Sequence, residues 1–176
     1  MDNYLYDSLD GLTAVPFSSS VYRHIASDRD CRSGEGSRAF GGRWNPPASF
    51  PVLYTSLTSH GAANELRRLA TRQGRYPSQI LPRTLCRLHV SLSRIVDLTS
   101  AETLQALYVV LSDDEGALES SQAVGFVAHR LGFEGLLVPA VGGDHTNLVV
   151  FELNLAASSL VVEESTTIWE KVSDLP

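Results

Sequence analysis

The sequence predicts an α+β fold, in which several short strands and two or three helices do not alternate regularly along the chain. Short β-branched or aromatic segments bounded by turn residues indicate the strands. Longer segments with apolar residues at helical spacing indicate the helices. The 176 residues are 43% hydrophobic and 19% charged, as in an ordinary globular protein. We therefore expect one domain over 1–176, with a polar N-terminal arm at 1–18 and a C-terminal appendage at about 165–176.

The first half of the chain predicts two strands followed by a helix. Residues 21–25 and 51–56 have strand composition, and a loop rich in glycine and arginine lies between them. From Ser59 the apolar residues recur at helical spacing, with Thr58 or Ser59 as the N-cap and Gly74 at the end. On this helix Glu65 falls at the edge of the apolar stripe, where it can face a cleft. We expect the helix arginines at 67, 68 and 72 to face solvent.

The second half predicts further strands and two capped helices. Its expected elements, in order, are a strand at 84–90, a helix from the Thr99–Glu102 capping box to about Val110, a solvated acidic loop at 113–115, a helix that follows Ser120 and Ser121 and stops at Gly132, a hairpin of 135–140 and 146–152 around Gly142 and Gly143, and a strand at 159–163.

The positive charge is concentrated at one end of the chain. Of 14 basic residues 13 are arginine; residues 1–94 carry a formal charge of +5 and residues 95–176 carry −11. The net charge of −6 argues against a general nucleic-acid coat. An arginine-lined cleft for a small anion remains compatible with it.

The sequence also excludes several other classes of protein. No apolar run approaches the roughly 18 to 20 residues that span a bilayer, and the acidic N-terminus does not resemble a signal peptide, so we expect a cytoplasmic protein without a membrane segment. Cys31 and Cys86 lie far apart, and we expect reduced thiols. The histidines show no HxxxH or Cys/His pattern, so we expect no metal.

The loop from Ser33 to Pro47 is the most unusual segment, with closely spaced glycines and two arginines. Glycine permits close approach to an anion and arginine donates paired hydrogen bonds to phosphate, which fits a pyrophosphate cradle. The spacing matches neither a P-loop nor a dinucleotide-fold fingerprint. The alternative is a structural surface loop, in which Trp44-Asn-Pro-Pro47 is a rigid turn.

Several single residues outside this loop have two possible interpretations each. Arg23 lies inside an apolar strand, so it needs an anionic partner, which is either an internal carboxylate such as Asp28 or Glu65, or a ligand phosphate. Tyr54 is either a core residue or a stacking platform. Ser121 is either a helix cap or a phosphate ligand at a helix start, and Asn147 is either a turn residue or a site residue.

The order of several motifs resembles the RES domain family over roughly residues 20–155. The motifs are Tyr22-Arg23, Ser33-Gly-Glu-Gly36, Gly42-Arg-Trp-Asn-Pro-Pro47, Val52-Leu-Tyr-Thr-Ser56, a helix carrying Glu65, Ser121-Gln122-Ala-Val-Gly125, Leu137-Val-Pro-Ala140 and Asn147. The family comprises toxins of RES-Xre toxin-antitoxin modules.

The resemblance implies a fold similar to ADP-ribosyltransferases, with a split antiparallel β-core and flanking helices, and an activity that cleaves NAD⁺. It implies the catalytic residues Glu65, Arg23, Arg43 and Tyr54. It implies a substrate-binding set of Arg23, Ser33, Gly34, Arg43, Tyr54, Ser121, Gln122 and Asn147. In that carry-over the two arginines hold the NAD⁺ phosphates, Tyr54 stacks near the nicotinamide and Ser121 completes the site. His24 stands where some relatives carry an aromatic residue, and its role stays open.

Three functions follow as hypotheses. The first is a toxin that depletes NAD⁺ by cleaving the nicotinamide–ribose bond, with inorganic phosphate or water as acceptor. The second is a protein mono-ADP-ribosyltransferase, and the third is a non-enzymatic anion-binding module. The resemblance also implies an Xre-type antitoxin that covers the active site in a hetero-oligomer, with DNA contact left to the antitoxin.

Overall fold

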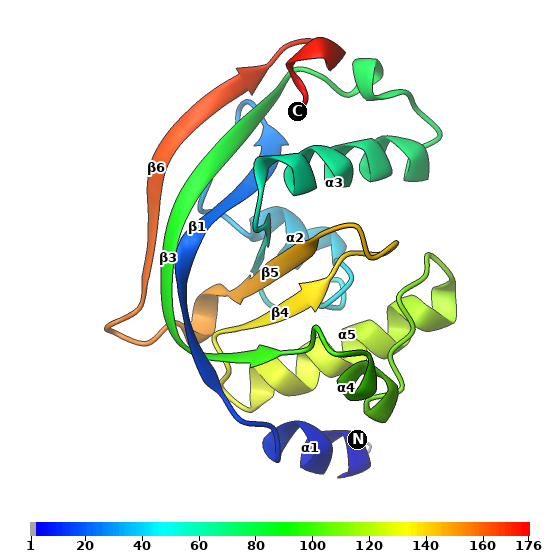
Figure 1. Ribbon diagram of the computed structural model, residues 1–176, viewed down its shortest axis with the longest axis vertical. Helices are drawn as coiled ribbons and strands as arrows, with labels where there is room; N and C mark the ends of the chain where they lie inside the picture. Colours follow the sequence, from blue (N-terminus) through cyan, green and yellow to red (C-terminus); the bar gives the residue numbers. More distant parts are fainter. Residues whose placement is uncertain (1–2) are drawn as a thin grey trace.

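The computed structural model describes residues 3–176 and shows a mixed α+β architecture (Figure 1). The strands are β1 (Val15–Ala26), β2 (Val52–Ser56), β3 (Arg83–Asp97), β4 (Gly135–Pro139), β5 (Thr146–Phe151) and β6 (Leu160–Trp169). The α-helices are α1 (Asn3–Asp10), α2 (Glu35–Phe40), α3 (Ser59–Arg72), α4 (Ala101–Ala106) and α5 (Glu115–Arg130), with 3₁₀ turns at Pro77–Gln79, Glu152–Asn154 and Val172–Asp174. The predicted fold class is confirmed.

The strands form a split sheet. The long strand β3 pairs antiparallel with β1 on one edge and with β6 on the other, and these three curve along one flank of the molecule (Figure 1). Strand β5 pairs antiparallel with β2 and β4. The halves meet where Tyr22 pairs with Ser56 and where the end of β3 runs parallel to β4. Helix α3 lies beside one half of the sheet and α5 lies beside the other (Figure 1). The junction of the two half-sheets therefore lies between these two helices.

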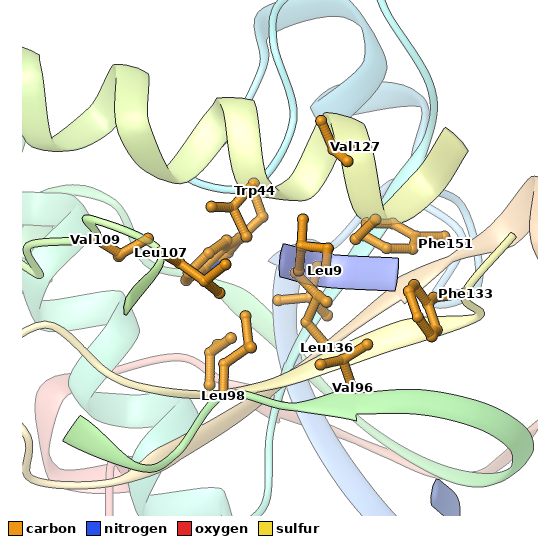
Figure 2. Close-up of a cluster of buried hydrophobic side chains, with 14 of the residues drawn as sticks. Leu9, Trp44, Val96, Leu98, Leu107, Val109, Val127, Phe133, Leu136 and Phe151 are labelled. Carbon is orange, nitrogen blue, oxygen red and sulfur yellow. The ribbon is translucent and has the colours of Figure 1, made fainter. Parts of the chain in front are cut away.

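A buried apolar cluster packs helices α1, α4 and α5 against the sheet (Figure 2). Leu9 of α1, Trp44 of the glycine-rich loop and Phe151 of β5 are each at most 2% exposed. At Gly125 of α5 a Cβ atom would lie 1.9 Å from the carbonyl oxygen of Trp44, so only glycine allows this approach. Trp44 is therefore a core residue that seats the loop on α5, where the sequence had suggested a rigid turn.

Most predicted elements are confirmed, and several extend further than expected. Strands β1, β3 and β6 are longer than the segments predicted at 21–25, 84–90 and 159–163. The hairpin of β4 and β5 and helix α3, capped by Thr58, are as predicted. The short helix α4 is capped by Ser100 and ends at Ala106, before the predicted Val110.

The predicted start of the second long helix is wrong. Helix α5 begins at Glu115, with Asp114 as its N-cap, so Ser121 lies in the second turn and not at the N-terminus. Glu115, the last residue of the acidic segment that had suggested a loop, is favourable in the first helical turn, because carboxylates stabilise the positive end of the helix dipole.

The chain ends also differ from the expected arm and appendage. Residues 1 and 2 of the expected arm lie outside the described residues, but Asn3–Asp10 forms α1, which packs against α5. At the other end β6 continues to Trp169, which pairs with Arg83 and is 2% exposed. Both ends bury apolar side chains, so they belong to the folded structure.

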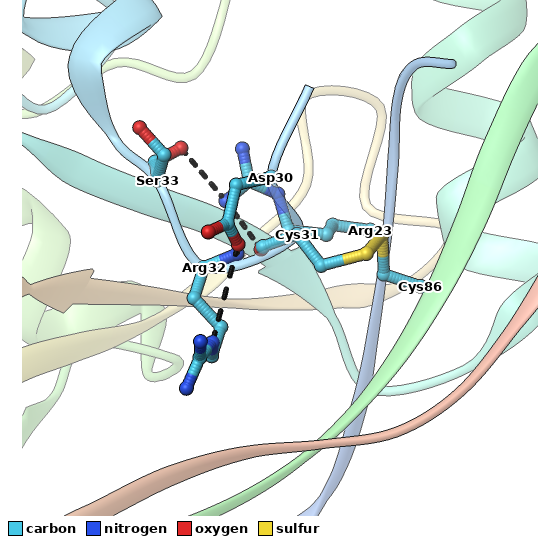
Figure 3. Close-up of a disulfide and its surroundings, with 6 residues drawn as sticks. All are labelled: Arg23, Asp30, Cys31, Arg32, Ser33 and Cys86. Atoms are coloured by element: carbon cyan, nitrogen blue, oxygen red, sulfur yellow. Dashed lines mark hydrogen bonds and ion pairs between the residues drawn. A yellow bond between two sulfur atoms is a disulfide. The ribbon is translucent and has the colours of Figure 1, made fainter. Parts of the chain in front are cut away.

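Cys31 and Cys86 form a disulfide, so the expectation of reduced thiols is wrong for this structure (Figure 3). The residues are 55 positions apart in sequence, yet their Cα atoms lie 5.9 Å apart. Cys86 of β3 stands opposite Arg23 of β1, and the loop after β1 returns over that pair. The disulfide therefore ties this loop to the sheet. Within residues 3–176 no helix is long and apolar enough to cross a membrane.

Glu134, just before β4, is a buried carboxylate that joins three segments. It is 1% exposed and accepts hydrogen bonds from the backbone N–H groups of Ser93, Arg94 and Ala156 and from the Ser93 and Ser159 hydroxyls. Burial acts to raise its pKa, but these hydrogen bonds outweigh burial and lower the pKa to about 2. The ionised carboxylate is therefore part of the native structure.

Glu134→Gln should destabilise the protein by about 2 to 4 kcal/mol at pH 7, because an amide cannot accept all of these bonds. The folded pKa lies below the usual 4.5, so the stabilisation is complete above about pH 4.5 and is lost as the pH falls toward 2. Urea unfolding at a series of pH values measures this. A variant with wild-type stability at pH 7 would contradict the structural role of the carboxylate.

Candidate functional site

A cavity of about 1120 Å³ lies at the junction of the two half-sheets. Strands β1 and β2, helices α2 and α3, the glycine-rich loop and the β4–β5 turn form its walls. Of the expected site residues, Arg23, Ser33, Arg43, Tyr54, Glu65 and Asn147 line it. Gly34, Ser121 and Gln122 do not. The fold thus gathers six of the nine positions from five separate segments.

Glu65 of α3 is held by hydrogen bonds from the hairpin of β4 and β5. Its Oε1 accepts a hydrogen bond from Asn147 Nδ2 at 2.8 Å and lies 3.1 Å from His145 Nε2. Ser56 donates to Asn147 Oδ1 at 2.7 Å, which orients the amide so that its NH₂ group faces Glu65. The Glu65 side chain is 29% exposed, so the fixed carboxylate remains accessible from the cavity.

His145 and Asp144 complete this arrangement, and the sequence did not identify either one. His145 Nδ1 lies 2.9 Å from Asp144 Oδ1, so each ring nitrogen faces a carboxylate. Asp144 Oδ2 in turn accepts a hydrogen bond from Asn64 of α3 at 2.7 Å. His145 and Glu65 lie 80 positions apart along the chain, and only the packing of the β4–β5 turn against α3 brings them together.

Arg23 has backbone carbonyls as its partners, and not the carboxylates Asp28 or Glu65 that the sequence suggested. Its Nη1 donates to the carbonyl oxygens of Cys31 at 3.0 Å and Ser33 at 3.3 Å, in the loop that the disulfide fixes (Figure 3). Its Nε is buried and has no partner among the described residues. Burial lowers the pKa of Arg23 to about 10, so the guanidinium is still charged at neutral pH.

His24 lies next to Arg23 on the cavity wall and is neutral. Burial, followed by the positive charges of Arg83, Arg23 and Arg72, lowers its pKa to about 3. Its Nδ1 is buried without a partner among the described residues. A neutral ring at this position adds no further positive charge.

Arg43 of the glycine-rich loop and Arg68 of α3 both line the cavity and share one carboxylate. Arg43 donates to the carbonyl oxygen of Ser112 at 2.8 Å, and Arg68 donates to that of Val141 at 2.7 Å. Asp113 lies 3.4 Å from Arg43 and 2.9 Å from Arg68. The prediction of a solvent-facing Arg68 is therefore wrong, because Arg68 is partly buried and lines the cavity. Asp113 and Asp114 are exposed and lie outside the helix, as predicted, and only Glu115 belongs to α5. Arg72 is exposed but also lines the cavity, whereas Arg67 bonds to Asn64 and to the Pro176 carbonyl.

The comparisons with known proteins agree with this architecture. The RES domain family model matches residues 20–171. The chain is 32% identical over 169 residues to proteins named NAD(+) phosphorylase MbcT in Mycobacterium tuberculosis and Mycobacterium bovis, covering 94% of this chain and 90% of theirs.

This chain belongs to the RES domain family.

The fold is also that of a solved relative. The crystal structure of the M. tuberculosis MbcT-MbcA toxin-antitoxin complex superposes with a TM-score of 0.85 at 28% identity, covering 96% of this chain and 93% of that chain. The core of this RES domain is accordingly the ADP-ribosyltransferase-like split β-core that the sequence motifs implied.

Several residues of the RES motifs lie behind the cavity wall. Ser121 is fully buried and donates to the carbonyl of Ala117 at 2.8 Å, within α5. Gln122 donates to the carbonyl of Gly42 at 3.0 Å, next to Arg43. A Cβ at Gly34 would lie 2.6 Å from the backbone nitrogen of Val52, so glycine is needed for the loop to pass β2. Gly34 and Gln122 therefore position the loop that carries Arg43, whereas Ser121 bonds within its own helix.

Tyr54 uses its hydroxyl to hold the same loop. The hydroxyl accepts a hydrogen bond from the Trp44 backbone N–H at 2.8 Å and donates to Asn45 Oδ1 at 2.7 Å. Asn45 is itself completely buried and donates to the carbonyls of Ser37 and Phe50. Burial raises the pKa of Tyr54 well above its usual value, which keeps the hydroxyl protonated as a donor.

Tyr54→Phe should therefore destabilise this RES domain by about 1 to 3 kcal/mol, because it leaves the Trp44 N–H and the Asn45 oxygen unpaired. Urea unfolding measures the change, with Tyr6→Phe on the exposed face of α1 as the matched control. Equal stability of the two variants would show that the hydroxyl does not support the loop.

Proposed function

We propose that this RES domain cleaves NAD⁺ by phosphorolysis, giving nicotinamide and ADP-ribose 1″-phosphate. The observation that carries the proposal is the fixed Glu65 carboxylate in the wall of an arginine-lined cavity. The MbcT relatives are named NAD(+) phosphorylases, which supports the same reaction. Cavity size supports it as well, since about 1120 Å³ is ample for a dinucleotide.

Glu65 stabilises the charge that develops as the bond breaks. Nicotinamide leaves as a neutral ring, so the ribose carbon becomes positively charged in the transition state and needs an anion more than a proton donor. The carboxylate is already held in place by Asn147 and His145, so it reorganises little when the carbon–nitrogen bond breaks. Its remaining oxygen, Oε2, accepts hydrogen bonds from the hydroxyl groups of the nicotinamide ribose.

The other residues bind and orient the dinucleotide. Arg23 and Arg43 hold the pyrophosphate, since guanidinium groups donate paired hydrogen bonds to phosphate. Ser33, Asn147 and the ring of Tyr54 line the space around the nicotinamide ribose. Gly34 and Gln122 act through the loop that they support, and Ser121 acts within α5, the helix that packs against Trp44 of that loop. No metal is invoked in this mechanism.

Glu65→Gln should lower the rate of nicotinamide release by about 10²- to 10⁴-fold, because the amide keeps the shape but loses the charge. Free nicotinamide is measured after mixing antitoxin-free protein with NAD⁺, in phosphate buffer and in phosphate-free buffer. Glu119→Gln, an exposed carboxylate of α5, is the matched control.

The two buffers distinguish the acceptors. Release that requires phosphate supports phosphorolysis, whereas equal release in both buffers indicates water as acceptor. Labelling of one protein band in lysate with little loss of NAD⁺ would instead indicate a protein ADP-ribosyltransferase. No NAD⁺ loss in either buffer and no labelling would leave the anion-binding module.

We also propose that the cognate partner is an Xre-type antitoxin that covers the cavity, and that the complex works in the cytoplasm, where it has access to cellular NAD⁺. The solved relative is a toxin-antitoxin complex, which supports a partner of this kind. Co-expression with the cognate antitoxin should restore growth and abolish nicotinamide release by the purified complex. Full activity of a stable complex would contradict coverage of the cavity.

A further inference from the structure

We propose that Arg68, together with the Nη2 group of Arg43, forms the binding site for inorganic phosphate, and that the Asp113 carboxylate occupies this site until phosphate displaces it. The inference rests on the proposed phosphorolysis and assigns its second substrate to particular side chains. Arg68 belongs to none of the positions identified from the sequence motifs.

The first argument is the geometry around Asp113. Both of its carboxylate oxygens lie within 3.0 Å of Arg68 Nη2, and Oδ1 lies 3.4 Å from Arg43 Nη2. The two arginines line the cavity, with side chains 14% and 25% exposed, whereas Asp113 is 52% exposed and does not line it. An acidic group thus bridges two cavity arginines from the solvent side.

The second argument is charge. Among the described residues six arginines line the cavity, against the four carboxylates Asp28, Asp30, Glu35 and Glu65. Arg72, one helical turn beyond Arg68, has no side-chain hydrogen bond or ion pair among the described residues and adds to the positive charge on this wall. A single carboxylate leaves this group of arginines with excess positive charge. A phosphate dianion matches it better and offers more acceptor oxygens.

The third argument is that the arginines fall into two groups with separate partners. Arg23 is held by the loop at Cys31 and Ser33, while Arg43 and Arg68 are held by Ser112, Asp113 and Val141. Two anions, the dinucleotide pyrophosphate and a free phosphate, would use two such groups. Arg43 Nη1 is buried and has no partner among the described residues. It can therefore donate to the pyrophosphate, while Nη2 of the same arginine donates to the free phosphate.

The position also suits the chemistry. Arg68 follows Glu65 by three residues on α3, so both lie on the same helix face. A phosphate oxygen forms the new bond to the ribose carbon as the carbon–nitrogen bond breaks, and the electron pair of that bond neutralises the nicotinamide ring. No additional oxidant or proton source is required.

Release of Asp113 has a low energetic cost. The Asp113 side chain is half exposed, so its carboxylate is already partly solvated in the ion pairs and regains water when it leaves. The carbonyls of Ser112 and Val141 continue to hold the two guanidinium groups after the carboxylate leaves. Asp113 therefore acts as an internal competitor that keeps the site closed at low phosphate.

The test is the Michaelis constant for phosphate, measured from nicotinamide release at saturating NAD⁺. Arg68→Gln should raise this constant by about tenfold or more, with the constant for NAD⁺ changed by less than about twofold. Asp113→Asn should lower the phosphate constant by about twofold to fivefold, because the competitor is removed. Arg67→Gln, the adjacent arginine outside the cavity, should change neither constant.

Two results would overturn the assignment. An increase in the NAD⁺ constant alone in Arg68→Gln would show that Arg68 holds the dinucleotide. A higher phosphate constant in Asp113→Asn would show that the carboxylate positions the arginines and does not compete. Arg68→Lys keeps the charge, and recovery of much of the phosphate affinity in it would show that misfolding does not explain the glutamine variant.

A second measurement separates this site from the proposed reaction. Phosphate alone should raise the melting temperature of the wild-type protein above that in chloride of equal ionic strength, and Arg68→Gln should abolish the difference. This result supports the site even where nicotinamide release proves independent of phosphate, an outcome that contradicts only the phosphorolysis. Equal phosphate stabilisation of both proteins contradicts the site.

Discussion

The structure around the cavity depends on holding partly buried arginines mainly through backbone carbonyls, with the single carboxylate of Asp113 shared between Arg43 and Arg68. Arg23, Arg43 and Arg68 each donate to backbone carbonyl oxygens, which are dipoles and not anions. A carboxylate at each place would satisfy the guanidinium groups but cancel the charge that a phosphate ligand needs. This constraint explains why the carbonyls that hold the arginines come from irregular segments, whose carbonyls are not used in strand pairing: the loop after β1, the segment before α5 and the β4–β5 turn.

Much of the fold and part of the site could be predicted, because local signals specified them. The Thr58 cap and apolar periodicity located α3, and the paired glycines located the turn between β4 and β5. The ordered motifs pointed to five residues that line one cavity: Arg23, Arg43, Tyr54, Glu65 and Asn147. The family resemblance supplied that ordering, since no single motif matched a known nucleotide loop. Periodicity also placed Glu65 correctly at the edge of the apolar face.

The rest depended on contacts between distant segments. Helical periodicity orients Arg68 relative to the core but does not show that a cavity lies beside that face. Only the packing of the turn against α3 brings His145 to Glu65. Cys31 and Cys86 pair because the register of β1 and β3 and the return of the loop bring them together. Ser121 was misplaced because acidic residues 113–115 look like solvated loop in sequence, although Asp114 caps a helix that begins at Glu115.

Glu134 has a consequence for the order in which the molecule assembles. Its carboxylate lies just before β4 and needs donors from β3 and from the turn before β6, all at once. A partly folded chain that buries Glu134 but lacks one of these segments would leave lone pairs unsatisfied inside an apolar interior, which is energetically unfavourable. The carboxylate thus disfavours half-assembled states and couples the central half-sheet to the long outer strands, so that the two halves of the split sheet gain their stability together and unfold as one cooperative unit.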